Sequence, residues 1–138
     1  MTATLVVGVG YLGQRFVEQN DGARGVTRAD FDLDHDGPFD VELPQLYNVI
    51  YTVPPARESA SDSRLERLLA RLEPAPQRFV YISTTGVYGD HGGATVDEDT
   101  PVNPASPHAA KRVAAEKTLR AWAEEKACEA IILRVPGI

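Results

Sequence analysis

The feature that most constrains the fold is the N-terminal stretch of residues 4–16, where an apolar run leads into glycines with the spacing GxGxxG. The run is typical of a buried strand, and the residues after Gly13 are typical of a helix. In such a unit Gly8 permits the tight turn, Gly10 lets the backbone approach a pyrophosphate, and Gly13 lets the helix pack closely on the strand. The N–H groups that begin the helix favour an anion. The stretch therefore predicts a dinucleotide-binding turn.

The rest of the chain alternates apolar runs with helical patterns. Helices are expected at about 11–20, 63–73 and 108–128, and further strands at about 23–27, within 29–38, and at 47–53, 78–83 and 130–135. Strands that alternate with helices form a parallel sheet with helices on both faces. We therefore predict an α/β fold of the Rossmann type, a doubly wound parallel sheet with strand order 3-2-1-4-5-6.

The length of 138 residues and the hydrophobic content of 43% suit one domain. We expect residues 1–138 to form an NAD(P)-binding domain. The chain stops at Ile138, directly after a strand that would lie inside the sheet. We therefore expect a truncated or partial chain.

The composition argues against several classes of protein. The apolar runs are too short to span a bilayer and the N-terminus lacks a secretion signal, so we expect a cytoplasmic protein without membrane contact. The single cysteine, Cys128, excludes an internal disulfide and a multi-cysteine metal site, and no metal is expected. The net charge is −6 and the basic residues are scattered, which argues against binding of nucleic acid. A small-molecule ligand remains compatible with this composition.

The chemistry is expected where the carboxyl ends of the parallel strands meet, because ligands bind there in open α/β sheets. Three stretches reach this edge: the glycine turn, residues 53–55 and residues 83–89. The long third helix also begins there, and His108 and Arg112 share one helical face with Leu119. Burial of Leu119 on the sheet would point His108 and Arg112 toward the cleft. The alternative is a solvated first turn with a chance histidine.

Several motifs together resemble one known family, the NAD-dependent epimerase/dehydratase family, the extended branch of the short-chain dehydrogenase/reductase superfamily. They are the glycine turn, residues 82–89 (ISTTGVYG), Asp97, Glu98, Pro101, residues 104–107 (PASP), Glu116 and residues 133–138 (LRVPGI). The resemblance implies an NAD(P)-dependent oxidoreductase or epimerase that acts on a small polar or sugar-like substrate. It also implies that residues 1–138 lack a C-terminal substrate-binding portion. It further implies a homodimer formed through two helices, one of them at residues 108–128.

The resemblance assigns the catalytic positions and shows an atypical active site. A strand-end hydroxyl that hydrogen-bonds the reacting oxygen of the substrate falls on Thr84. The positions of the family's acid/base tyrosine and of its lysine are occupied by His108 and Arg112. His108 can exchange a proton near neutral pH, and Arg112 is a permanent cation suited to ribose or phosphate. Lys111, one residue out of register, is the alternative for the lysine role, and a non-catalytic NAD(P)-binding sensor or regulatory module is the alternative function.

Cofactor choice is predicted from the end of the second strand, where Thr27 and Arg28 stand. An arginine there suits the 2′-phosphate of NADP, whereas an acid would hold the free 2′-hydroxyl of NAD. NADP is therefore favoured, and the nearby Asp30 and Asp32 keep NAD as the alternative. The resemblance implies that Asp32 and Leu33 flank the adenine. The predicted cofactor-binding residues are Gly8, Gly10, Tyr11, Leu12, Gly13, Arg28, Asp32, Leu33, Val53, Pro54 and Ser83.

Overall fold

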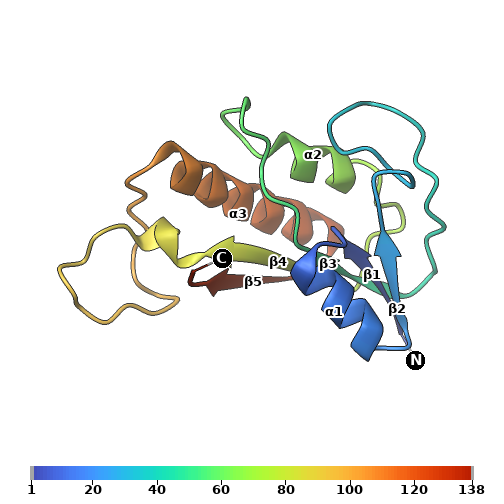
Figure 1. The fold of residues 1–138 in the computed structure, drawn as a ribbon, viewed down its shortest axis with the longest axis horizontal. Helices are drawn as coiled ribbons and strands as arrows, with labels where there is room; N and C mark the ends of the chain where they lie inside the picture. The colour runs from blue at the N-terminus through green and yellow to red at the C-terminus, as the bar shows by residue number, and fades with distance from the viewer. Residues whose placement is uncertain (1, 138) are drawn as a thin grey trace.

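The computed structural model describes residues 2–137, which form a five-stranded parallel sheet with helices on both faces (Figure 1). The elements in chain order are β1 (Ala3–Val7), α1 (Tyr11–Gln19), β2 (Ala23–Val26), β3 (Tyr47–Tyr51), α2 (Ser63–Leu69), β4 (Arg78–Thr84), the 3₁₀ turn η1 (Thr85–Tyr88), α3 (Pro107–Lys126) and β5 (Glu129–Val135). The strand order is β2-β1-β3-β4-β5. The Rossmann-type α/β fold is therefore confirmed. In the described part of the chain, no helix combines the length and apolar character needed to cross a membrane.

The prediction of a strand within residues 29–38 is wrong, because the described chain forms turns there. The Asp30 carboxylate accepts hydrogen bonds from the Thr27 N–H at 2.8 Å and from the Thr27 hydroxyl at 3.1 Å, and Asp32 accepts one from the Asp34 N–H at 2.9 Å. Aspartates that bind neighbouring backbone groups compete with a strand ladder. The sheet therefore has the predicted order with its third strand left out.

The hydrophobic core lies between the sheet and helices α2 and α3, while α1 covers the other face (Figure 1). Alternate side chains of β3 and β4 are fully buried: Tyr47, Val49, Tyr51, Phe79 and Tyr81. They share the core with leucines from the two helices: Leu65, Leu68, Leu69 and Leu119. Each buried leucine stabilises the fold by about 1.5–3 kcal/mol. This packing fixes the carboxyl ends of the parallel strands along one edge, beside the start of α1 and of α3.

Candidate functional site

The glycine turn between β1 and α1 has the conformation that its spacing predicts. Gly8 has φ +95°, and a Cβ there would lie 2.5 Å from Thr52 Oγ1 and 2.8 Å from Val53 Cγ2. A Cβ at Gly13 would overlap the carbonyl oxygen of Gly8. At Gly10, by contrast, no described atom lies within 4 Å of the place where a Cβ would be. Gly8 and Gly13 are thus required by the fold, and Gly10 borders open space.

The N-terminus of α1 faces this open space. Gly10 is the N-cap, no described side chain caps the helix, and the first helical bond runs from the Gln14 N–H to the Gly10 carbonyl at 2.9 Å. The N–H groups of the first turn, which include those of the exposed Tyr11 and Leu12, have no partner within the helix. Open space beside free N–H groups at a helix N-terminus suits a diphosphate. The residues present therefore fit the predicted dinucleotide.

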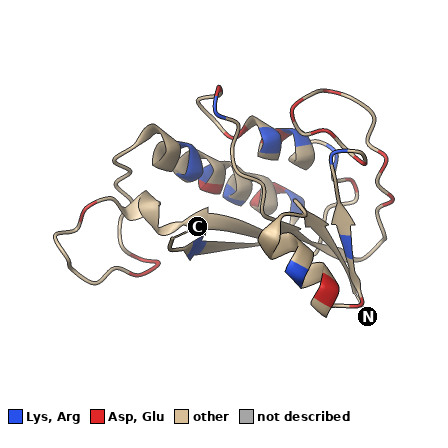
Figure 2. Ribbon diagram, in the orientation of Figure 1, with Lys and Arg blue, Asp and Glu red and all other residues tan. Residues whose placement is uncertain are grey.

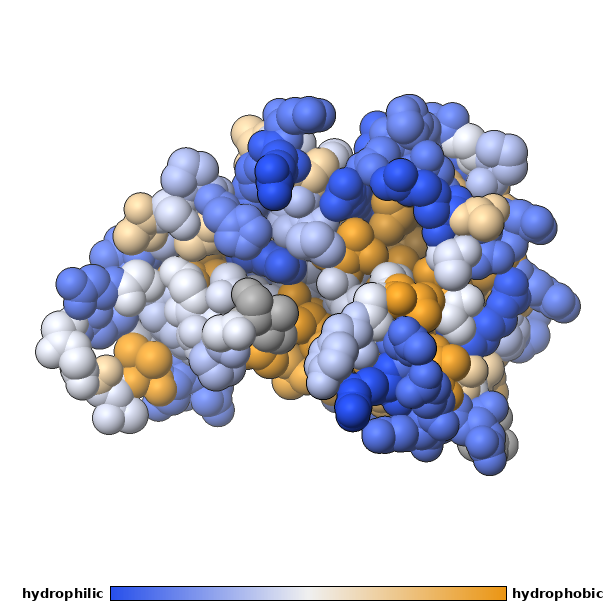
Figure 3. All heavy atoms as spheres, in the orientation of Figure 1, coloured by the Kyte–Doolittle hydropathy of each residue, from blue (hydrophilic) through white to orange (hydrophobic). Residues whose placement is uncertain are grey.

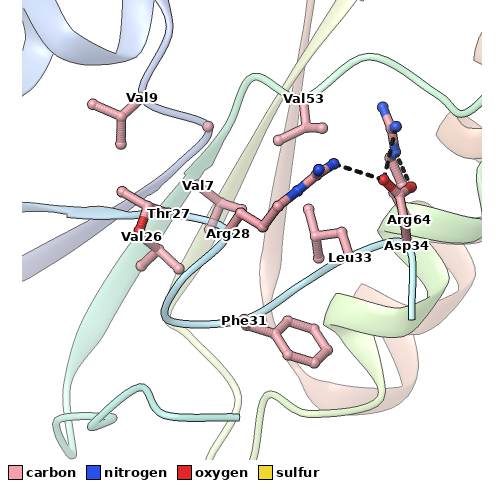
Figure 4. Close-up of a pocket in the computed structure, with 11 residues that line it drawn as sticks. Val7, Val9, Val26, Thr27, Arg28, Phe31, Leu33, Asp34, Val53 and Arg64 are labelled. Atoms are coloured by element: carbon pink, nitrogen blue, oxygen red, sulfur yellow. Dashed lines mark hydrogen bonds and ion pairs between the residues drawn. The ribbon is translucent and has the colours of Figure 1, made fainter. Parts of the chain in front are cut away.

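A pocket of about 320 Å³ lies beside the glycine turn (Figure 4). It is lined by Val7, Gly8, Val9, Val26, Thr27, Arg28, Phe31, Leu33, Asp34, Val53 and Arg64. On the surface of the molecule, apolar atoms show in a recess rimmed by hydrophilic side chains (Figure 3). Asp32 does not line the pocket, because its carboxylate accepts the Asp34 N–H and lies 3.0 Å from His35 Nδ1.

One end of the pocket carries a charged cluster of Arg28, Asp34 and Arg64 (Figure 4). Arg64 Nε donates to Asp34 Oδ1 at 2.6 Å, and Arg28 donates to Asp34 Oδ2 at 2.9 Å. The hydrogen bond from Arg64 is the main reason why the pKa of Asp34 lies below its usual value. Arg64 and Asp34 are the functional candidates that sequence reasoning missed. Asp34 had a signal in its acidic segment, whereas Arg64 on α2 had none.

His108 and Pro54 line a second, wider pocket of about 1170 Å³ between the loop after β3, α2 and the start of α3. Lys111 lines it too, and its ammonium donates to the carbonyl oxygens of Ala56 at 2.8 Å and Arg57 at 2.7 Å. These bonds hold the loop after β3 against the first turns of α3. They also occupy the ammonium group of Lys111, the alternative to Arg112 for the role of the family's lysine.

Arg112 points toward β4 rather than toward the cleft expected from the helical spacing. Its NH1 group donates to the Tyr81 hydroxyl at 3.1 Å and to the Ile82 carbonyl at 3.0 Å. The Tyr81 hydroxyl in turn donates to the buried Asp62 at 3.2 Å. Arg112 takes this direction because the buried tyrosine and the strand carbonyl offer it acceptors close to the core.

Asp62 gives this cluster a testable pH dependence. Burial raises the pKa of Asp62 above its ordinary 3.8, although hydrogen bonds from the Leu65 N–H and the Tyr81 hydroxyl oppose the rise. A raised pKa in the folded state means that the carboxyl favours folding most below the ordinary value and loses this contribution as pH rises through the folded-state pKa. We expect the wild type to lose stability relative to Asp62→Asn as pH rises above about 4. Urea unfolding from acid to neutral pH measures the difference.

The matched control for this prediction is Asp36→Asn, because the Asp36 side chain is 88% exposed. Its difference from the wild type should stay nearly constant over the same pH range. A pH-independent difference for Asp62→Asn as well would contradict the role assigned to burial.

The end of β4 carries two hydroxyls with different surroundings. Ser83 is buried and donates to Glu116 Oε2 at 2.7 Å, so its hydroxyl serves the packing of α3. Thr84 is half-buried, and its Oγ1 accepts the Gly86 N–H at 3.1 Å. A Cβ at Gly86 would lie 3.4 Å from Thr84 Oγ1 and 4.0 Å from Ala109 Cβ, which puts η1 between Thr84 and the first turn of α3. The structure thus brings Thr84 and the segment that carries His108 to the same end of the sheet.

A buried ion pair supports this end of the sheet. Arg134 on β5 donates to Glu116 Oε1 at 2.6 Å and to the Tyr88 hydroxyl at 3.0 Å. The hydrogen bond to Glu116 is the main cause that raises the pKa of Arg134. The pair therefore ties together α3, η1 and β5 around the Ser83–Thr84 strand end.

The family model described as the NAD dependent epimerase/dehydratase family matches residues 62–137. No curated protein matches the sequence.

Solved structures resemble the whole described fold. RMD from Pseudomonas aeruginosa, complexed with NADPH, has a TM-score of 0.74 at 20% identity, over 99% of this chain and 54% of that one. A double mutant of DesIV, the dTDP-glucose 4,6-dehydratase from Streptomyces venezuelae, with NAD and DAU bound, has a TM-score of 0.72 at 21% identity, over 96% and 55%. UDP-glucuronic acid 4-epimerase from Bacillus cereus, in complex with NAD, has a TM-score of 0.67 at 18% identity, over 98% and 56%. The present chain thus spans about half the length of each, and these likenesses show the fold.

Proposed function

The chain belongs to the NAD-dependent epimerase/dehydratase family, since the family model matches more than half of it, and on this premise we propose that it is a nicotinamide-dinucleotide-binding domain. We propose that it serves oxidoreductase or epimerase chemistry on a small polar, sugar-like substrate. The observation that carries the proposal is the open space at Gly10, beside the free N–H groups of α1 and next to the pocket. The NADPH and NAD named with similar solved structures support it.

In this proposal the residues of the glycine turn hold the diphosphate, and the pocket residues Leu33, Val53 and Arg28 hold the adenosine half. When bound, the nicotinamide ring would supply or accept a hydride. Thr84 donates a hydrogen bond to the reacting oxygen of the substrate. His108, exposed on the first turn of α3, exchanges a proton with the substrate, because an imidazole ring can both donate and accept a proton. Arg112 acts from the core side, through its bonds to Tyr81 and the Ile82 carbonyl, by fixing α3 on β4.

A second candidate function is a non-catalytic NAD(P)-binding module. The observation in its favour is that Lys111 and Arg112, near the start of α3, donate hydrogen bonds to other parts of the chain. The Lys111 ammonium is bound to two backbone carbonyls, and Arg112 donates to β4. Neither is placed as a free cation beside His108, where the family's lysine would support its acid/base residue. Dinucleotide binding without turnover would favour this function.

His108→Ala tests the catalytic proposal. We expect the full-length protein to bind NADPH and to turn over a member of a panel of carbonyl compounds and nucleotide sugars, with turnover measured as NADPH consumption. We expect His108→Ala to lower kcat about a hundredfold, because general acid–base groups typically contribute at least that factor. NADPH affinity, measured by isothermal titration calorimetry, should change less than twofold, since His108 does not line the smaller pocket.

The matched control for the catalytic test is His91→Ala. His91 lies in the loop after η1, and its Nε2 is 2.8 Å from the Tyr88 carbonyl oxygen. The kcat of this variant should stay within a few-fold of the wild type. Full turnover by His108→Ala would remove His108 from the mechanism, and a wild type that binds no dinucleotide would overturn the proposed function itself.

A further inference from the structure

The charged cluster at the end of the smaller pocket joins two elements that are far apart in the chain. Arg28 follows β2 and Arg64 lies on α2, and both donate to Asp34 (Figure 4). Figure 2 shows the acidic residues of the loop after β2 beside the basic residues of α2. All three side chains of the cluster line the pocket. Both guanidinium groups are therefore held at one place on its wall.

The oxygens of Asp34 are already satisfied. Oδ1 accepts from Arg64 Nε, and Oδ2 accepts from Arg28 at 2.9 Å and from the NH2 group of Arg64 at 3.1 Å. Because these guanidinium groups keep the pKa of Asp34 low, its carboxylate is ionised near neutral pH. The pocket lining at this end carries two guanidinium cations against one carboxylate, and Asp32, which pairs with Arg28 at 3.9 Å, lies outside the lining. The cluster thus favours an additional anion.

The other acids that would favour a free ribose hydroxyl are engaged elsewhere. The Asp30 carboxylate accepts from the Thr27 N–H and hydroxyl, and Asp32 accepts from the Asp34 N–H. Neither residue lines the pocket, and among the described lining residues Asp34 is the one acid. The lining therefore offers donors to an anion and no free carboxylate to a 2′-hydroxyl.

Arg64 is the better fixed of the two cations. Its side chain is 22% exposed, against 74% for Arg28, and its NH1 group also donates to the Pro54 carbonyl at 3.0 Å. A side chain that is already ordered loses less conformational entropy when it binds a ligand. Arginine donors also match the geometry of phosphate oxygens.

From this arrangement we propose that Arg64 determines cofactor specificity, by binding the 2′-phosphate of NADP together with Arg28 while Asp34 holds the two guanidinium groups side by side. The inference rests on the proposed dinucleotide binding and adds to it a specificity-determining residue on α2. The anion recognised is a phosphate monoester on the ribose of the adenosine half.

The test compares two ligands that differ in the 2′-phosphate alone, adenosine 2′,5′-bisphosphate and 5′-AMP, by isothermal titration calorimetry on the 138-residue chain. We expect the wild type to bind the bisphosphate more tightly than 5′-AMP. Arg64→Gln should lower the affinity for the bisphosphate about tenfold, as expected for loss of a charge-assisted hydrogen bond. It should change the affinity for 5′-AMP less than twofold. The same variant should lower the preference for NADPH over NADH by a similar factor.

The matched control is Arg67→Gln, which removes one positive charge from the same helix and two contacts to the same loop. Arg67 pairs with Asp36 at 3.3 Å and donates to the Leu33 carbonyl, but it does not line the smaller pocket. Arg67→Gln should therefore change the affinities for both ligands by the same factor and leave the ratio of the two affinities unchanged. Circular dichroism and thermal unfolding verify that both variants are folded.

Four outcomes would overturn the inference. If Arg64→Gln lowered the affinities for both ligands equally, the substitution would have damaged the pocket in general. If Arg67→Gln lowered the ratio of bisphosphate to 5′-AMP affinity as much as Arg64→Gln does, the cause would be a long-range charge effect. Binding of NADPH and NADH with a ratio that Arg64→Gln leaves unchanged would reject the role of Arg64 while the proposed function stands. A wild type that binds neither dinucleotide would reject both.

Discussion

Gly13→Ala is expected to lower the free energy of unfolding by about 3 kcal/mol or more, at the upper end of the effects of overpacking. A Cβ at this position would overlap the Gly8 carbonyl oxygen and lie 3.2 Å from Val6 Cγ1. The carbonyl has little freedom to yield, because it accepts the Thr52 hydroxyl at 2.8 Å at the end of β3. The added methyl group must therefore push α1 away from the sheet. Urea unfolding followed by circular dichroism measures the loss.

Gly10→Ala is the matched variant, since it adds the same methyl group three residues earlier in the same turn. Its Cβ would meet no described atom within 4 Å, and Gly10 has extended φ and ψ that alanine can adopt. Its stability should fall by less than about 1 kcal/mol, which reflects the weaker N-cap preference of alanine. Its affinity for NADPH, however, should fall at least about tenfold, because the methyl group fills space proposed for the diphosphate.

These two variants separate the structural from the binding role of the turn. A stable Gly13→Ala protein would show that α1 can shift without loss. Unchanged NADPH binding by Gly10→Ala would mean that the dinucleotide, if bound, lies elsewhere.

Arg134→Met is the second substitution expected to have a large effect, with a loss of about 3–5 kcal/mol in stability. Glu116, which is 2% exposed, would keep its hydrogen bond from Ser83 but lose its close pairing with the arginine. Arg120 lies 3.7 Å from the same carboxylate and is mainly exposed, so it replaces little of the lost interaction. A buried carboxylate without its partner is costly, whereas methionine preserves much of the side-chain volume. Chemical denaturation at neutral pH measures the change.

The exposed pair between Arg78 and Glu129 provides the control. It joins β4 to β5, the strand that also carries Arg134, at 2.8 Å, with side chains 51% and 58% exposed. Arg78→Met should change stability by less than about 1 kcal/mol, because solvent screens exposed ion pairs. The double variant Glu116→Gln/Arg134→Met should recover part of the loss. Equal effects of Arg78→Met and Arg134→Met would contradict the role assigned to burial.

Local patterns predicted the three helices and five of the six expected strands correctly, because each of these elements depends on residues close together in the chain. The apolar run before Gly8 and the leucines of α2 are examples. The strand expected around Phe31 failed, although its alternation of acid and apolar residues is regular. There the aspartates accept hydrogen bonds from their own loop, as Asp30 does from Thr27. These local hydrogen bonds compete with strand pairing, so the alternation of acidic and apolar residues does not produce a strand.

The predicted site shows the same division. Gly8, Arg28, Leu33 and Val53 line the smaller pocket because they follow strands whose carboxyl ends meet at one edge. Arg64 was not predicted, since its place in the pocket depends on how α2 packs across the sheet from β2. The binding roles of all these residues stay predictions until the dinucleotide titrations are made.

The sequence by itself determined the parallel α/β fold and the place of the glycine turn, because periodicity and the need for a positive φ at Gly8 are local properties of the chain. Only the tertiary structure decided which charges face the pocket and that Arg112 donates to β4. The partner of a long polar side chain depends on which acceptors other elements bring within reach. Helical spacing places Arg112 on a face, but the Tyr81 hydroxyl and the Ile82 carbonyl decide where its guanidinium group binds.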